Sequence, residues 1–263
     1  MLHLYWYSYA IFFSIIFFPF IYYKSYEESK LLEEYVETTV KNSLTLSLNT
    51  ENLLGYNIFE RNKRISESAG ITPATILIPG IPTSEDGNAH ILSVKGKLYI
   101  VIDYLLAKKG KYVADGIIAH ELGHIFNEIK IKKYLFLAHT GFIGCFEFYF
   151  SLYVIFRLFL HFPEITSVFL NLSFTFYLLR ILFLVAKNIL SREEEYRADK
   201  FAISLLEKPE SFIEWLENYP RENIEINTSS GFLNKVLMFT LGDHPPIHKR
   251  VERMRLQVSQ KNS

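Results

Sequence analysis

Residues 113–128 constrain this chain more than any other stretch, because they place two histidines one helical turn apart. The stretch reads V-A-D-G-I-I-A-H-E-L-G-H-I-F-N-E, in which His120, Glu121 and His124 form the pattern H-E-x-x-H. Two imidazoles at positions i and i+4 of a helix can bind one metal ion at about 2.0–2.1 Å each, and a glutamate beside the first can reach a water on that metal. Zinc would then need a third protein ligand and would keep its fourth position for the water.

The residues around this pattern predict an amphipathic helix. Ile118, Leu122, Ile125 and Ile129 follow one another at i, i+4, i+7 and i+11, which is an apolar stripe at helical spacing. The two histidines then lie on the opposite face, where we expect Gly123 to leave the approach to the metal uncrowded. The alternatives are a chance match to a short pattern and a solvated histidine pair on a polar helix face.

Composition excludes several classes of protein. The chain has 263 residues, and its 28 Lys and Arg balance 28 Asp and Glu, so nothing suggests nucleic-acid binding. Its single cysteine, Cys145, allows neither an intrachain disulfide nor a cysteine zinc site, so any zinc must be held by His and carboxylates. The hydrophobic share of 49% and aromatic share of 16% are high for a soluble enzyme and leave room for membrane segments beside one domain.

Three apolar stretches are predicted to span a membrane. Residues 1–23 carry no Lys, Arg, Asp or Glu and have aromatic residues at both ends. We interpret them as a retained anchor, because a cleavable signal peptide would show a basic start and a small-x-small site. Residues 134–156 and 165–186 form a predicted hairpin, which returns the chain to the side that it left. The segments before and after the hairpin therefore share one compartment.

Basic residues predict which compartment that is. By the positive-inside rule they place the catalytic side in the cytoplasm and the N-terminus outside. Only Arg157 flanks the spans on the outer side, whereas seven basic residues flank them on the catalytic side: Lys24, Lys30, Lys130, Lys132, Lys133, Lys187 and Arg192. Glu147 and Arg180 lie within the spans, where they either line a polar path for substrate or make helix-pairing contacts and snorkel.

The segment between the first span and the H-E-x-x-H helix predicts an α+β order. Residues 51–70 read as an amphipathic helix that is stopped by Gly70 and Pro73. Three β-rich runs follow, at residues 74–78, 90–94 and 97–103. Lys95-Gly96 separates the last two and is a tight hairpin signal. We expect a mainly helical domain with a small antiparallel sheet and about three transmembrane helices.

The predicted domain organisation has five parts. They are an N-terminal transmembrane anchor at 1–23, a helical linker at 24–50, a first part of the catalytic domain with the H-E-x-x-H helix at 51–133, a transmembrane hairpin at 134–186, and a second part of the catalytic domain at 187–263.

A second motif follows the hairpin and reads S-R-E-E-E-Y-R-A-D-K-F-A. Ser191 and Glu194 match an S-x-x-E capping box, so we expect a helix to begin here. Glu195 and Asp199 lie on the stripe that becomes the buried face of this helix, with Ala202 further along it. A buried carboxylate is costly without a cation or donors. Zinc for Glu195 and a ligating imidazole for Asp199 would supply both; alternatively, the glutamates merely favour a helix N-terminus.

These motifs together resemble a known family. H-E-L-G-H, followed by a membrane hairpin and E-Y-R-A-D, resembles the HtpX-like membrane zinc metallopeptidases, relatives of the type I CAAX prenyl proteases. The match extends to G-N-A before the strand hairpin and to D-H-P-P-I-H-K-R-V near the C-terminus, and it covers roughly residues 51–254. The resemblance implies a zincin-like domain. HtpX proteins usually carry two spans before the catalytic part where this chain has one, and prenyl proteases have many more than three, so we do not expect prenyl-protein processing.

The resemblance also implies roles for individual residues. It implies that His120, His124 and Glu195 bind zinc and that Glu121 is the general base. Asp199 would hydrogen-bond to a zinc ligand. Asn88 and Ala89 would belong to a substrate-binding strand, and His244 and Arg250 would lie near the active site. Without the resemblance, Asn88 reads as a turn residue at the entry to a strand whose edge could bind an extended peptide. Pro245 and Pro246 after His244 indicate only a turn that opens a helix, whose core stripe comprises Ile247, Val251, Met254 and Val258.

The sequence therefore predicts a membrane-anchored zinc-dependent metalloendopeptidase with one Zn²⁺ per chain. We expect an integral protein of the cell inner membrane that acts on polypeptides such as membrane or misfolded proteins, in membrane-protein quality control. The alternative is a zinc-binding membrane scaffold or receptor without hydrolytic activity. An intramembrane protease would place the H-E-x-x-H pattern inside a span, and Asp115, Glu128 and Lys130 make that stretch too polar.

Overall fold

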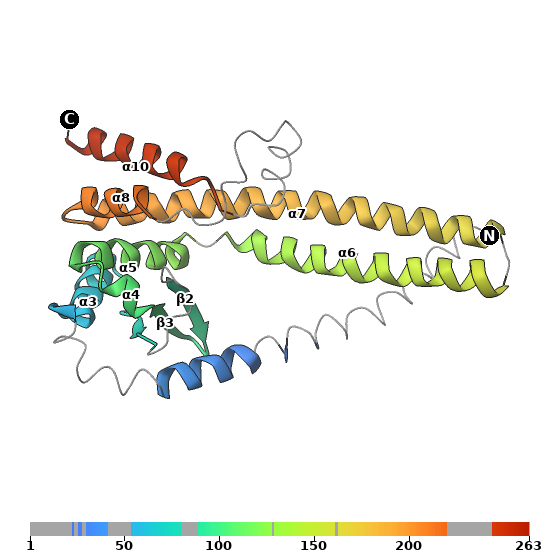
Figure 1. Cartoon of the computed structure of the whole chain (residues 1–263), viewed down its shortest axis with the longest axis horizontal. Helices are drawn as coiled ribbons and strands as arrows, with labels where there is room; N and C mark the ends of the chain where they lie inside the picture. Colours follow the sequence, from blue (N-terminus) through green and yellow to red (C-terminus); the bar gives the residue numbers. More distant parts are fainter. Residues whose placement is uncertain are drawn as a thin grey trace. The chain divides into compact units, whose positions relative to one another are not determined.

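The structure is a computed structural model that describes residues 23, 26–27, 30–41, 54–79, 89–127, 129–160, 163–219 and 244–262 (Figure 1). The chain divides into two compact units. One comprises residues 1–30, 129–191 and 236–243, and the other comprises residues 31–128, 192–235 and 244–263. The predicted N-terminal span lies, except for Tyr23, outside the described residues.

The second unit contains a mixed three-stranded sheet. Its order is β1-β3-β2, with β1 at Thr75–Leu77, β2 at Ala89–Val94 and β3 at Lys97–Ile102. The β2–β3 hairpin is confirmed, and its turn residues Lys95 and Gly96 both have positive φ angles of 49° and 74°, as a type I′ turn requires. The antiparallel prediction is wrong for β1, which pairs with β3 in parallel. Eleven residues separate β1 from β2 in the sequence, so the direction in which β1 joins β3 is not fixed by a two-residue turn.

Helix α5 (Lys111–Phe126) is the central element of this unit. It contacts α3 (Ile58–Ser68), α4 (Tyr104–Ala107), α8 (Pro209–Glu217) and β2. Every residue from Val113 to Gly123 is consequently buried. The amphipathic interpretation is wrong, because helices cover the histidine face as well as the apolar stripe. The helix ends at Phe126, so Ile129 lies beyond it.

Two glycines allow other helices to approach α5 closely. A Cβ atom built on Gly123 would lie 2.8 Å from the Cα atom of Ala198, on α7. A Cβ on Gly116 would lie 2.3 Å from the ring of Phe212, on α8. Both distances are too short for a side chain. Gly123 therefore provides a close helix–helix contact, and the prediction that it leaves open space beside the metal is wrong.

Helix α7 (Pro163–Leu205) runs without interruption for 43 residues. The prediction that a helix begins at Ser191 is wrong, because Ser191 lies inside α7. No Pro or Gly separates the apolar first part of α7 from the Glu-rich second part, and both are composed of residues that continue a helix. The backbone N–H groups that a capping box would satisfy are already bonded within the helix.

Helix α3 is fixed to α5 by a buried ion pair. The Arg61 guanidinium donates from Nε and Nη2 to the two carboxylate oxygens of Asp115, and both side chains are largely buried. Asn57 caps α3, accepting from the backbone N–H groups of Phe59 and Glu60. The predicted stop at Gly70 is confirmed by its φ of 68°.

The other face of the sheet is covered by a helix at residues 31–41. The ring of Tyr35 lies 6.1 Å from that of His90 on β2, and Lys95 pairs with Glu33 at 2.9 Å. Val36 and Thr39 of the same helix are buried.

Helix α10 (Ile247–Asn262) completes the unit by packing on α8. Its predicted core stripe is confirmed: Val251 and Met254 are buried, and Ile247 and Val258 pack against the same core.

The first unit is an antiparallel pair of apolar helices, α6 (Lys130–Ile155) and the first part of α7. A π-helical segment, η1 (Phe156–Leu160), follows α6. Aromatic contacts join the pair along its length: Phe142 meets Phe183 at 5.1 Å, and Phe156 meets Phe169 at 5.2 Å. Among the described residues, two helical stretches, Tyr134–Phe159 and Ile165–Leu205, are long and apolar enough to cross a membrane.

Candidate metal centre

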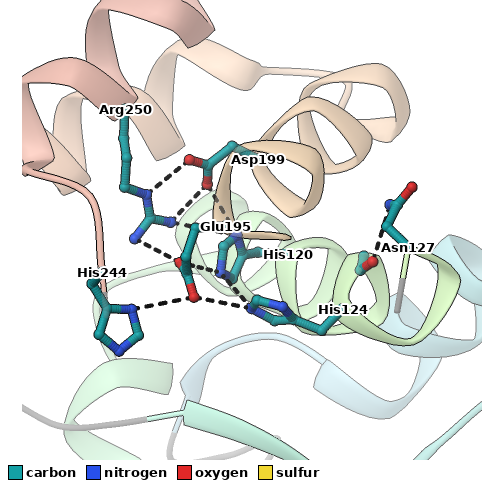
Figure 2. A network of polar contacts seen from close by, with 8 residues as sticks. His120, His124, Asn127, Glu195, Asp199, His244 and Arg250 are labelled. Carbon is teal, nitrogen blue, oxygen red and sulfur yellow. Dashed lines mark hydrogen bonds and ion pairs between the residues drawn. The ribbon is translucent and has the colours of Figure 1, made fainter. Parts of the chain in front are cut away.

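Three side chains from two helices converge on one point (Figure 2). The Nε2 atoms of His120 and His124, both on α5, lie 3.2 Å apart. Glu195, on α7, places one carboxylate oxygen 3.5 Å from His120 Nε2 and the other 3.5 Å from His124 Nε2. Ligand atoms of all three lie within 4.8 Å of one another. The sequence predicted this set of residues, and the structure brings them together.

The spacing of these atoms fits a tetrahedral metal ion. Ligands at 2.0–2.1 Å from a tetrahedral zinc lie about 3.3–3.4 Å from one another. The two Nε2 atoms are 3.2 Å apart, and each of them lies 3.5 Å from a different carboxylate oxygen of Glu195. His120 Nδ1 lies 3.0 Å from Asp199 Oδ1 and donates a proton there. When a metal ion displaces the other ring proton, the Nε2 lone pair of the imidazole is therefore directed toward His124. Two nitrogen atoms and a carboxylate that face one another in this way form a site for a cation.

The contact between α5 and α7 explains how Glu195 and Asp199 reach the histidines. The two carboxylates lie one helical turn apart on α7 and are 7% and 2% exposed. Ala198 lies on the same face and contacts Gly123, which is next to His124 in the chain. Because neither Gly123 nor Ala198 holds the helices apart, the carboxylates of α7 come within hydrogen-bonding distance of the α5 imidazoles.

Arg250 on α10 neutralises the two carboxylates. Its Nε donates to Asp199 Oδ2 at 2.8 Å and its Nη2 to Asp199 Oδ1 at 2.7 Å, while Nη1 lies 3.2 Å from Glu195 Oε2. All three guanidinium nitrogens are thus directed to these carboxylates (Figure 2). The resemblance alone placed Arg250 near the active site. In the structure its guanidinium holds the carboxylates of Asp199 and Glu195 in place.

These contacts determine the charges at the site. Burial would raise the pKa of Asp199, but hydrogen bonds from Arg250 and His120 lower that pKa more strongly. Burial opposes ionisation of Glu195 as well, and bonds to His120 and His244 leave its pKa well below the usual range. Burial would lower the pKa of His120, but Asp199 and Glu195 raise it to about 9 in the metal-free protein. Both carboxylates are ionised at neutral pH, which suits a cation site.

Glu121 lies beside the ligands and faces the sheet. It is 8% exposed, and burial raises the pKa of its carboxyl group. A hydrogen bond with the backbone of Ile91, on β2, acts in the opposite direction. The structure therefore connects the H-E-x-x-H helix to the edge strand β2 through Glu121, a contact for which sequence spacing gives no signal.

His244 lies on the solvent side of the cluster. Its side chain is 67% exposed, and its Nδ1 is 3.2 Å from Glu195 Oε1. The structure thus brings this residue, which was expected only from the resemblance, to the metal ligands. Ala89 is the first residue of β2 and pairs with Ile102, whereas Asn88 lies outside the described residues.

Two interactions near the site were absent from our sequence interpretation. One is the ion pair of Arg61 with Asp115, one helical turn and a residue before His120. The other is the stacking of Arg253 on Tyr196, with the guanidinium carbon 3.6 Å from the ring centroid. Arg250 and Arg253 are spaced i, i+3 on α10, so both lie on one helix face. This spacing is the sequence signal that could have indicated the contact of Arg253 with α7.

Comparison with known proteins supports the same chemistry. A family model described as peptidase family M48 matches residues 57–258. The match contains α5, the α7 residues Glu195 and Asp199, and most of α10. No curated protein and no solved structure was found to match the chain.

Proposed function

The chain belongs to peptidase family M48, and on that premise we propose that it is a membrane-anchored, zinc-dependent metalloendopeptidase. The family implies a metallopeptidase. The observation that carries the finer proposal is the convergence of His120, His124 and Glu195, whose ligand atoms lie within 4.8 Å of one another beside the buried carboxyl group of Glu121. A zinc ion held there would act as a Lewis acid toward the scissile carbonyl group and would activate a water molecule.

Glu121 is the proposed general base. It takes a proton from the attacking water and passes the proton to the leaving amine. Its burial supports this role, because burial raises the pKa of the carboxyl group toward the neutral range in which a base can also act as an acid. Glu121 is adjacent to His120 in the chain, yet its carboxylate is not one of the three converging ligands.

Asp199 and Arg250 are proposed to hold the ligands rather than to touch substrate. Asp199 accepts the Nδ1 proton of His120 and so fixes the tautomer that can bind a metal. Arg250 is itself nearly buried and directs its donors to Asp199 and Glu195. His244 is different, because its exposed imidazole lies on the open side of the cluster. We assign it to contact with the substrate backbone.

The substrate is proposed to bind as an extended strand along β2. In the described sheet β2 is an edge strand, since it pairs only with β3 there. An extended peptide can add to such an edge by main-chain hydrogen bonds. The contact of Ile91 with Glu121 supports this path, because it brings the general base to the same strand. Ala89 and Asn88 would then bind the peptide where β2 begins.

The setting is proposed to be the cell inner membrane. The two apolar helical stretches in the described residues support membrane association, and residues 1–23 are the proposed further anchor. The basic flanks of the spans favour a catalytic part that faces the cytoplasm. Membrane and misfolded proteins are the polypeptides that such an enzyme would encounter, and quality control is the role that we propose.

One experiment tests the proposed activity. The detergent-purified protein and its Glu121→Gln variant would be compared in zinc content and in cleavage of casein. We expect equal zinc content and a rate lower by about 10²–10⁴-fold, because the amide cannot accept the proton. Glu193→Gln is the matched control, since Glu193 is an exposed glutamate that pairs with Arg197 and should leave the rate unchanged. Equal cleavage by wild type and Glu121→Gln would leave the non-hydrolytic scaffold as the better account.

A further inference from the structure

Two arginines on α10 reach α7 from adjacent turns. Arg250 binds Asp199 and Glu195, and the Arg253 guanidinium carbon lies 3.6 Å above the ring centroid of Tyr196. Tyr196 directly follows Glu195 in the chain and is partly buried, whereas Arg253 is exposed. The two contacts therefore lie side by side between the same pair of helices. A guanidinium stacked on an aromatic face is held by electrostatic attraction to the ring and by close contact.

The position of Arg250 matters because its partners are buried charges. Asp199 is 2% exposed and Glu195 is 7% exposed. A buried ion pair tolerates little displacement, since each charge that loses its partner keeps the cost of its lost hydration. A shift of α10 along α7 would weaken the hydrogen bonds of Arg250 and leave the carboxylates beside His120 less well held.

Two other polar contacts tie α10 to its neighbours, further along the helix from Arg250. Arg255 pairs with Glu217 on α8 at 2.6 Å, and both side chains are exposed. Lys261 contacts the Ser204 carbonyl at 3.5 Å, near the other end of α10. Val251 and Met254 bury apolar surface, which fixes α10 against the core but not its register along α7. Arg253 on Tyr196 is the directional contact next to the site.

We propose that Tyr196 and Arg253 are positioning residues that hold Arg250 against Asp199 and Glu195, and thereby set the zinc affinity of the centre. The inference rests on the proposed function for the zinc site itself. Neither residue belongs to the group of three converging side chains. They act through Arg250, and their loss weakens metal binding without removing any ligand or the general base.

The test measures zinc affinity of the detergent-purified full chain by competition with a chelator. Tyr196→Leu and Arg253→Gln are each expected to weaken binding by about 2- to 5-fold, the loss of one exposed cation–π contact. Tyr196→Phe keeps the aromatic face and should bind zinc as wild type does. Arg255→Gln is the control, because it makes the same substitution on the same helix but breaks only the pair with Glu217.

A second background shows whether Tyr196 acts through Arg250. Arg250→Gln alone should weaken zinc binding by about 10–100-fold, and adding Tyr196→Leu to it should cause no further loss. Cleavage at saturating zinc should stay within about 2-fold of wild type for Tyr196→Leu, because base and ligands are intact. Equal losses from Tyr196→Leu in both backgrounds, or a loss in Tyr196→Phe as large as in Tyr196→Leu, would overturn the inference. A wild-type protein that binds no zinc would instead overturn the proposed function, and the inference with it.

Discussion

Arg250 donates two hydrogen bonds to the carboxylate of Asp199, although the two residues are 51 positions apart in the chain. Asp199 in turn accepts from His120, so one carboxylate joins α10 to the H-E-x-x-H helix. These contacts form a chain from Arg250 through Asp199 to the imidazole of His120, whose other nitrogen, Nε2, faces His124. The candidate metal centre is therefore braced by a helix that supplies none of the three converging side chains.

Removing the charge of Arg250 should destabilise the protein. Arg250→Leu leaves the buried carboxylates of Asp199 and Glu195 without their cation, and breaking a buried pair in this way costs about 3–5 kcal/mol. Chemical denaturation of the detergent-solubilised protein in the presence of a chelator would measure the loss. Arg255→Leu removes an exposed pair on the same helix and should cost no more than about 1 kcal/mol. Similar losses for the two variants would contradict the charge-balancing role of Arg250.

Removing a ligand should abolish tight metal binding. His124→Ala deletes one of three converging side chains, and two protein ligands are too few for a stable zinc site. The expected result is less than stoichiometric zinc after dialysis against a chelator, measured by elemental analysis. His248→Ala, at an exposed position on α10, should keep the full metal content. Full zinc retention in His124→Ala would show that the ligand set is different.

Adding one methyl group at Gly123 should separate the two ligand-bearing helices. The new Cβ of Gly123→Ala would lie 2.8 Å from the Ala198 Cα atom, so α5 and α7 must move apart. Overpacking of this kind costs about 1–3 kcal/mol, and the shift carries Glu195 away from the histidines. Thermal unfolding and zinc competition would measure both effects. Adding Ala198→Gly should restore little, because the nearest atoms belong to the α7 backbone; full rescue would place the conflict in the Ala198 side chain instead.

Metal-free protein should lose stability as the pH rises above neutral. The folded-state pKa of His120 is raised from 6.5 to about 9, so its contribution is fully present below pH 6.5 and is lost as the pH rises through 9. Zinc needs the neutral imidazole, so zinc affinity should increase over the same interval as the competing proton leaves. Denaturation of chelator-treated and zinc-loaded samples between pH 6.5 and 9 would show a decline in the first and none of comparable size in the second. A flat profile in metal-free protein would contradict the raised pKa.

A reporter fused after Ser263 should be active only in a cytoplasmic format. The motive is the excess of basic residues on the catalytic side of the spans. Paired fusions with a reporter that works inside the cell and one that works outside it would measure the orientation. Reducing the charge bias, by replacing Lys130, Lys132 and Lys133 with Gln, should weaken the preference. External activity of the wild-type fusion would overturn both the hairpin and the orientation.

Local periodicity explains how much of this site could be predicted from the sequence. His120 and His124 are one turn apart on one helix, and so are Glu195 and Asp199, so each pair is defined by spacing alone. The inward position of Asp199 followed from the apolar residues that continue its stripe, and the structure buries it as expected. The Lys95-Gly96 hairpin turn was predicted correctly as well, because its signal lies within the two turn residues themselves.

The incorrect predictions concern features that neighbours decide. The direction of β1 depends on which side of β3 it joins, and no pattern within Thr75–Leu77 encodes that choice. Ser191 matched a helix start because a capping pattern does not record that the preceding residues are already helical. The sequence around Gly123 predicted open space because the helix that packs against it, α7, comes from a distant part of the chain.

The burial of α5 on all sides has a consequence for how metal could enter and leave. Backbone amides at the centre of such a helix exchange with solvent only when much of the domain opens, so residues 117–122 should be among the slowest to exchange deuterium. His120 lies within this buried run, and His124 follows directly after it. His244, at 67% exposed, stands on the opposite side of the cluster before α10. The side chain of His124 is 24% exposed as well, so we expect an ion to exchange with solution past these two imidazoles without unfolding of the α5 core.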